Sequence, residues 1–166
     1  APTTQPTPAR VLPVSRVIEL ETAGPPPPDT SVSFPAGTPR VIVLRHGPPE
    51  NIRFAQLSFE AAAFADSGRM VTVSVRVRPG IYGLDVGIDQ PVRGGARVDF
   101  DYARYFSAPV RARQVYRGDQ AYERALAVGR LLPEGQIELL PSTRPELDQI
   151  GAAMPGPGSY LVAAPQ

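Results

Sequence analysis

Met70-Val71-Thr72-Val73-Ser74-Val75-Arg76-Val77-Arg78 is the most regular stretch of the chain. Its four valines occupy every second position, and polar residues stand between them. Strict alternation of β-branched and polar side chains is typical of a β-strand with one buried face. The pair Pro79-Gly80 follows directly and marks the end of the strand. The stretch therefore predicts a strand that covers a hydrophobic core.

Short strand-like runs continue in both directions from this stretch, spaced roughly ten residues apart and separated by Gly and Pro. Upstream strands are expected at 32–34, 40–44 and 52–59, with a helical turn or a tight connection at 61–66. Downstream strands are expected at 82–88, 96–102 and 159–164, with an edge strand at 109–116 and a turn of helix at 146–150. This pattern predicts an all-β fold, an Ig-like antiparallel β-sandwich.

The stretch 119–140 is ambiguous. Asp119 can cap a helix that continues through Tyr122 and Leu126. Alternatively, 126–132 is a strand that turns at Pro133-Glu134-Gly135 into a second strand at 136–140. We favour the hairpin for the second half of the stretch.

The composition excludes several classes of site. The 166 residues include no Cys and no Lys, one His and one Asn. Disulfide scaffolds, thiolate metal sites and Cys nucleophiles are therefore excluded, as is Schiff-base catalysis by Lys. The net charge of +1, with acids and arginines interleaved, does not predict a nucleic-acid partner. No apolar run approaches the roughly 18 residues of a membrane-spanning helix.

The first residue and the composition suggest where the protein acts and what kind of organism makes it. The chain begins at Ala1 without Met, which we interpret as a secreted or cell-surface protein after signal-peptide removal. A recombinant chain that has lost its tag is the alternative interpretation. The 21 prolines and the scarcity of Asn and Cys fit a thermophilic source.

The first 30 residues are expected to form an arm separate from a β-sandwich domain at 31–166. A Pro/Thr-rich stretch at 1–10 precedes a strand at about 11–21. Pro25–Pro28 then form a stiff spacer that would hold this strand about 12 Å from the body. This geometry suits a strand that completes the sheet of a neighbouring copy. The assembly residues predicted for this donor strand are Val14, Val17, Ile18 and Leu20. Packing of the arm across its own sandwich is an open alternative.

Two motifs resemble known functional signatures, but neither has the other residues that its function requires. Val41-Ile42-Val43-Leu44-Arg45-His46-Gly47 resembles the Arg-His-Gly signature of the histidine phosphatases, but that chemistry needs a second His. His46 also has no identifiable partner for a Ser-His-Asp triad. Leu140-Pro141-Ser142-Thr143-Arg144 resembles a sortase signal, but it is internal and is interpreted as a turn. No catalytic residue and no cofactor is predicted.

Two further groups of residues are candidates for binding. Four aspartates on strands expected to be neighbours could hold Ca²⁺, although a solvated face paired with arginines is favoured; they are Asp85, Asp89, Asp99 and Asp101. Four tyrosines could form an exposed binding platform, although core packing is favoured; they are Tyr102, Tyr105, Tyr116 and Tyr122.

Two segments resemble the ZU5-type β-sandwich of bacterial surface proteins. Leu57-Ser58-Phe59-Glu60-Ala61-Ala62-Ala63-Phe64, followed by Gly68 and Val71-Thr72-Val73, is similar to a strand, a turn and a Val/Thr-rich strand of that family, with Glu60-Ala61-Ala62 in place of the usual Pro-x-Gly. Gly135-Gln136-Ile137-Glu138-Leu139-Leu140 and Ser159-Tyr160-Leu161-Val162 are similar to its closing hairpin and last strand, with Ile137 where Trp is usual. The resemblance implies an Ig-like sandwich with an adhesive or scaffolding role and no catalytic residues.

These patterns predict a protein that is not an enzyme. We expect a structural subunit of an extracellular filament or surface assembly, whose partners are copies of itself joined by N-terminal strand donation. The alternative is a monomeric binding module for carbohydrate or protein, displayed on the cell surface.

Overall fold

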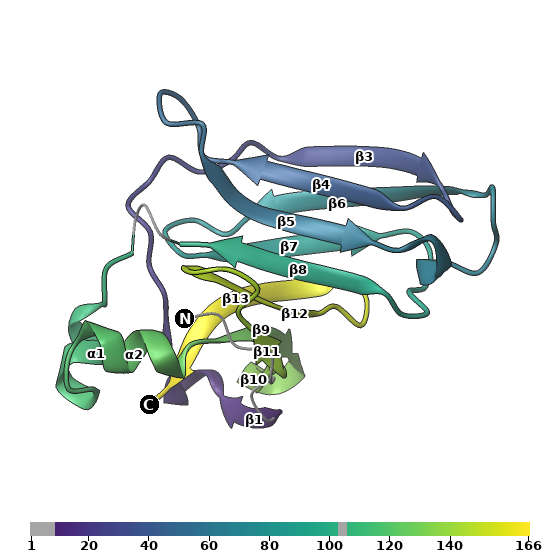
Figure 1. Cartoon of the computed structure of the whole chain (residues 1–166). Coiled ribbons are helices and arrows are strands. Elements are labelled where there is room, and N and C mark those ends of the chain that lie inside the picture. Colours follow the sequence, from purple (N-terminus) through teal and green to yellow (C-terminus); the bar gives the residue numbers. More distant parts are fainter. Residues whose placement is uncertain (1–8, 103–105) are drawn as a thin grey trace.

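The computed structural model of the chain describes residues 9–102 and 106–166. Two antiparallel sheets pack face to face and enclose the hydrophobic core, as the layered strands of Figure 1 show. The sequence-based prediction of an all-β sandwich is confirmed. The expected Pro-rich stretch at 1–10 lies almost wholly outside the described residues.

The larger sheet has the strand order β1-β10-β9-β13-β7-β6-β3, and β2 also pairs with β13. Its strands are β1 (Arg10–Pro13), β2 (Val17–Glu19), β3 (Thr30–Pro35), β6 (Met70–Val77), β7 (Gly83–Ile88), β9 (Ala127–Leu132), β10 (Gln136–Leu139) and β13 (Gly158–Pro165). The smaller sheet has the order β11-β12-β8-β5-β4. Its strands are β4 (Arg40–Arg45), β5 (Arg53–Phe59), β8 (Ala96–Asp101), β11 (Ser142–Thr143) and β12 (Gln149–Ala153).

Two short α-helices and three 3-10 turns connect the strands. The helices are α1 (Val110–Val115) and α2 (Asp119–Ala125), and the turns are η1 (Val14–Arg16), η2 (Ala61–Ala63) and η3 (Pro133–Gly135). Both α-helices lie at one end of the molecule, beside the C-terminal end of β13 (Figure 1).

The alternating valines form β6, as predicted. Val71, Val73 and Val75 are buried, while Thr72 and Ser74 point outward. β6 lies between β3 and β7 in the larger sheet. Six further predicted strands are confirmed, with ends that differ by a few residues; they are β3, β4, β5, β7, β8 and β13.

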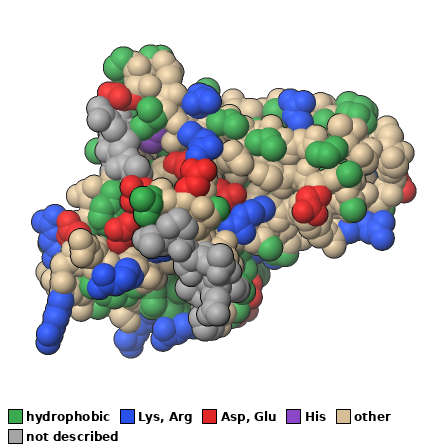
Figure 2. Space-filling model, in the orientation of Figure 1, with side chains coloured by type: hydrophobic (Ala, Val, Ile, Leu, Met, Phe, Trp, Pro, Cys, Tyr) green, Lys and Arg blue, Asp and Glu red, His purple; other side chains and the backbone are tan. Residues whose placement is uncertain are grey.

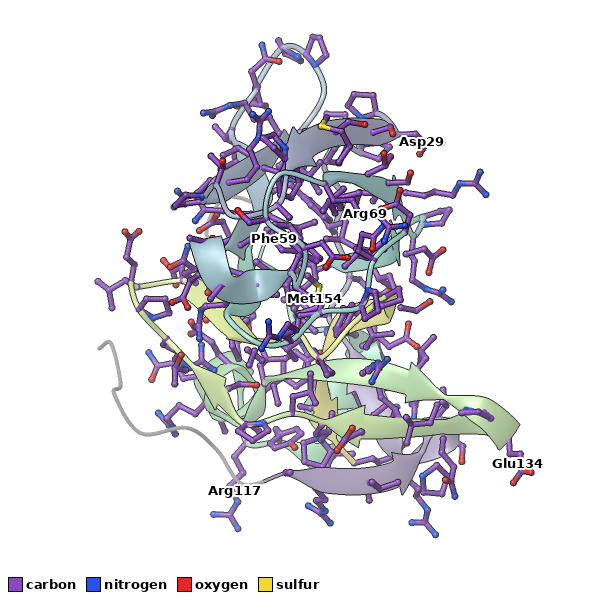
Figure 3. All side chains as sticks on the ribbon, turned by 90° about the vertical axis from the view of Figure 1, so that its right-hand side faces the viewer. Asp29, Phe59, Arg69, Arg117, Glu134 and Met154 are labelled. Atoms are coloured by element: carbon purple, nitrogen blue, oxygen red, sulfur yellow. The ribbon has the colours of Figure 1, made fainter. Side chains whose placement is uncertain are left out.

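Aromatic and aliphatic side chains from both sheets fill the space between them. In Figure 3, Phe59 and Met154 point into this space, whereas Asp29 and Glu134 lie on the outside. Phe59 packs against Phe34 at a ring-centroid distance of 5.7 Å. The core is therefore made by residues from strands far apart in the sequence.

Three local predictions were resolved by the structure. The hairpin at 126–140 is confirmed as β9 and β10, and a helix (α2) precedes it. The edge strand expected at 109–116 was wrong, because this stretch forms α1. Pro109 precedes the first turn of α1, and Ala112 is its buried residue, whereas Val110 faces solvent. The helical turn expected at 146–150 was also wrong, because β12 begins at Gln149 and pairs with β8.

The N-terminal region differs most from expectation. The strand expected at 11–21 is divided into β1 and β2 by η1. Both parts pair with the larger sheet of the same chain, so the region is built into the sandwich instead of standing apart from it.

Candidate functional site

The N-terminal segment (residues 10–21) closes a ring of strands. β1 pairs with β10, with Leu12 opposite Ile137. β2 pairs with β13, with Ile18 opposite Ala164. β9 lies between β10 and β13 and pairs with both. The segment therefore joins the two ends of the series β10-β9-β13, and we call the surface that receives it the seat.

The ring encloses a hydrophobic cluster of its own. Its buried members are Val17, Ala127, Ile137, Leu139, Leu161 and Ala163, with Leu12, Val14, Ile81 and Leu131 packed against them. The segment supplies three of these side chains, from Leu12, Val14 and Val17. Without the segment, the β9, β10 and β13 members of this cluster would face water.

The other face of the segment belongs to the main core. Ile18 and Leu20 are 2% and 0% exposed. Leu20 lies at a three-way junction of backbone hydrogen bonds: its N–H donates to the Val162 carbonyl at 2.8 Å, and its carbonyl accepts from Tyr82 N–H at 3.0 Å. Val162 N–H in turn donates to the Tyr82 carbonyl at 2.9 Å. At this junction the neighbour of β13 changes from β7 to β2.

Helix side chains tie the two chain ends together. Tyr122 Oη on α2 donates to the Ile18 carbonyl at 3.0 Å. Tyr116 Oη donates to the Pro165 carbonyl, and Arg111 Nη2 donates to the Ser15 carbonyl at 3.4 Å. Burial raises the pKa of both tyrosines above the ordinary value, so both hydroxyls remain donors.

Of the four predicted assembly residues, three are buried in the seat of the same chain. Val17 faces the ring cluster, while Ile18 and Leu20 face the main core. Val14 lies in η1, is half-buried, and packs against the ring cluster. The sequence thus identified the side chains that hold the segment, and the structure shows them in contact with their own domain.

The spacer (Pro25–Pro28) leads from the segment to β3 and rests on the loop after β4. Pro25 O lies 2.9 Å from His46 Nδ1 and accepts a hydrogen bond from Gly47 N at 3.2 Å. His46 is 2% exposed, and only a small purple area marks it on the surface in Figure 2. Its ring makes edge contacts with Phe54 and Tyr82, at centroid distances of 5.2 and 6.4 Å. The residue considered for catalysis thus packs beneath the spacer.

The four aspartates do not converge. Asp99 and Asp101 lie on β8 in the smaller sheet, whereas Asp85 and Asp89 lie on or beside β7 in the larger sheet. The expectation that the two strands are neighbours was wrong. No group of three or more metal-ligating side chains occurs among residues 9–102 and 106–166.

Each aspartate has a protein partner instead. Asp99 accepts from Arg97 Nε at 3.0 Å, Asp101 from Arg53 Nη2 at 3.3 Å, and Asp89 from Thr72 N at 2.9 Å. Burial raises the pKa of Asp99 and Asp101, and the neighbouring arginines oppose this only in part. Burial alone would also raise the pKa of Asp85, but hydrogen bonds from Ser159 and Arg78 outweigh it and lower the value.

The proposed platform of tyrosines is not present as a surface. Tyr102 and Tyr122 are each 0% exposed. Tyr116 is half-buried, and Tyr105 lies outside the described residues. Tyr102 Oη donates to Glu123 Oε2 at 2.9 Å and accepts from Arg144 Nη1, so it fastens α2 to the sheet. The core-packing alternative is correct for Tyr102 and Tyr122.

The stretch 140–144 serves as a structural turn. Ser142 Oγ donates to the Leu140 carbonyl at 2.8 Å and accepts from Val128 N at 2.9 Å. A groove of about 540 Å³ crosses the outer face of the larger sheet, where Ser31, Ser74 and Asp85 are among its lining residues. None of the residues that line it is aromatic.

Comparisons with known proteins give no relative: no protein-family model, no curated protein and no solved structure matches the chain. The resemblance to the ZU5-type sandwich therefore stays a prediction. Within the described part of the chain, no helix has the length and apolar character needed to cross a membrane.

Proposed function

We propose that this protein is a non-enzymatic structural subunit of an extracellular or cell-surface assembly, in which copies are joined by exchange of the N-terminal segment. The observation that carries the proposal is the closed ring. A segment near the start of the chain completes both a sheet and a hydrophobic cluster, and the spacer tethers it to β3. An identical segment from a second copy fits the same seat, because every contact that it makes is encoded in the shared sequence.

The free energy gained by burying the segment favours a stable link between copies. Burial of Val17, Ile18 and Leu20 is worth roughly 2 kcal/mol for each side chain. The same burial is recovered in trans, so exchange costs little beyond the entropy of association. A groove of about 570 Å³ between β2 and the start of α1, lined by Val17 and Val110 among others, leaves the outer side of the segment uncovered.

Head-to-tail exchange also predicts open assemblies. Each chain has one segment to give and one seat to fill, and these are distinct surfaces. A contact between two distinct surfaces is heterologous, and it grows into a filament unless the rotation closes into a ring.

An engineered disulfide tests the proposal. Glu19 lies opposite Ala163 in the register of β2 and β13. The adjacent pair is hydrogen-bonded, from Leu20 N to Val162 O, and the bond from Gln166 N to Arg16 O fits the same alternation along the two strands. Glu19 and Ala163 are therefore a non-hydrogen-bonded pair with a short Cα separation. The chain has no native Cys that would interfere. We expect the variant E19C/A163C, oxidised after assembly at high protein concentration, to give a ladder of linked chains on a non-reducing gel.

The matched control is S33C/T72C. Ser33 Oγ and Thr72 Oγ1 are 2.9 Å apart on β3 and β6, which both follow the spacer and do not exchange. This pair should form disulfides only within one chain. If E19C/A163C also stays within one chain at every concentration, exchange is wrong. Linked dimers without larger species would contradict the filament.

A further inference from the structure

The spacer can accept backbone hydrogen bonds but cannot donate them. Its four residues are all prolines, so they offer backbone carbonyls but no N–H groups. A backbone hydrogen bond that holds the spacer must therefore come from a donor on the body of the protein. At Pro25 the body presents two nitrogens to the same carbonyl, His46 Nδ1 at 2.9 Å and Gly47 N at 3.2 Å.

The His46 side chain is held firmly from behind. Its backbone N–H donates to the Ile52 carbonyl at 2.8 Å, which fixes the residue at the end of β4. The ring abuts Phe54 and Tyr82, and these two rings stack on each other at a centroid distance of 5.2 Å with an interplanar angle of 17°. Tyr82 is also the residue whose backbone bonds to Leu20 at the junction in the seat. The same rigid group therefore supports both the spacer and the segment.

We propose that His46 is a latch that holds the spacer, and through it the N-terminal segment, on its own chain. The bond requires the proton of the ring to be on Nδ1. We expect the segment to leave its seat together with the spacer, because only three residues separate them, and this movement breaks the contact with Pro25. The latch rests on the proposed exchange for its biological meaning, but its physical effect on the segment can be measured in a single chain.

A purely structural role for His46 makes a different prediction from a latch. If the ring only fills the core, an apolar replacement should preserve the structure better than a polar one. If His46 is a latch, a replacement that keeps the hydrogen-bond donor should hold the segment better than an apolar one. His46→Leu keeps an apolar side chain against Phe54 and Tyr82 and removes the donor. His46→Asn loses the ring but places an amide nitrogen near the former Nδ1 position.

Hydrogen–deuterium exchange of the full-length chain separates these roles. Loss of one hydrogen bond should make the amides of residues 16–22 exchange about fivefold faster in H46L. In H46N their exchange should stay within about twofold of the wild type, because the donor is kept. The amides of β6 should not change in either variant. Equal acceleration in both variants, or faster exchange in H46N than in H46L, would overturn the latch.

The disulfide variant then distinguishes the latch from the proposed function. In the E19C/A163C background, H46L should link chains about fivefold faster than the parent, and H46N should not. If the amides respond as expected but no variant links chains, the exchange proposal fails and the latch stands. If H46L and its parent link chains at the same rate, the latch fails and the exchange stands.

Discussion

Leu20 holds the segment in the seat through both its side chain and its backbone. It is fully buried, and its backbone bonds to both Val162 and Tyr82. We expect Leu20→Ala to lower the free energy of unfolding by about 3 kcal/mol, because it removes buried methyl groups and leaves a cavity. The measurement is a denaturant titration at neutral pH.

Val11 provides the control on the same segment, because its side chain is 52% exposed on β1. Val11→Ala should change the stability by less than about 0.5 kcal/mol. Similar losses for the two variants would mean that the segment is not seated as described.

Asp99 gives the protein a pH dependence of known sign. Burial raises its pKa above the ordinary value of 3.8. Across the interval just above that value, the folded state holds more protons than the unfolded chain, so the free energy of unfolding falls as the pH rises. Asp99→Asn removes this contribution, and its stability should decline less between about pH 4 and pH 6.

Denaturation midpoints measured across this interval test the prediction. A steeper decline for Asp99→Asn than for the wild type would contradict the assigned sign.

At the scale of elements, the body needs an occupant in the seat, whether that segment comes from the same chain or from another copy. Its buried side chains contribute roughly 6 kcal/mol, an amount comparable with the 5–15 kcal/mol that typically holds a domain together. Deletion of residues 1–24 should therefore give a marginally stable chain that binds a hydrophobic dye. The truncated chain retains β10 and β13 but leaves the seat without its occupant.

Complementation tests this view of the segment. A peptide of residues 10–24, added to the truncated chain, should raise its melting temperature, and above the dissociation constant the rise should grow with the logarithm of the peptide concentration. The same peptide with I18D should not, because it would bury an unpaired carboxylate. Unchanged stability after truncation would show that the seat needs no occupant.

The sequence predicted most strands because their alternation is local. The valines of β6 and the Pro-Glu-Gly turn before β10 carry their information within a few residues. The misassigned stretches depend on distant partners. β12 is visible as a strand only once β8 lies beside it, where Gly151 makes room for the side chain of Asp99.

Dependence on distant partners also explains which features of the seat the sequence did not predict. Hydrophobic alternation identified Ile18 and Leu20, but the choice between seats in cis and in trans depends on β10 and β13, which lie far along the chain. The role of His46 was hidden for the same reason. Nothing near His46 in the sequence indicates that its ring meets Pro25, although a polyproline run signals that any partner must be a donor.

For the whole molecule, the two sheets provide a stable body, and the ring at one end joins the start of the chain to its end (Figure 1). The seat is thus a seam between distant parts of one chain. The structural role proposed above rests on this seam.

The closed ring also fixes an order of events during synthesis. β2 is made long before β13, the strand against which it pairs. Pairing between such distant strands is slow, and the segment lacks its partner strands until β10 and β13 have been made. A nascent chain therefore carries a strand without its partner for part of its synthesis, and under the proposed exchange this is the stage at which pairing with a neighbour competes with closure on the same chain.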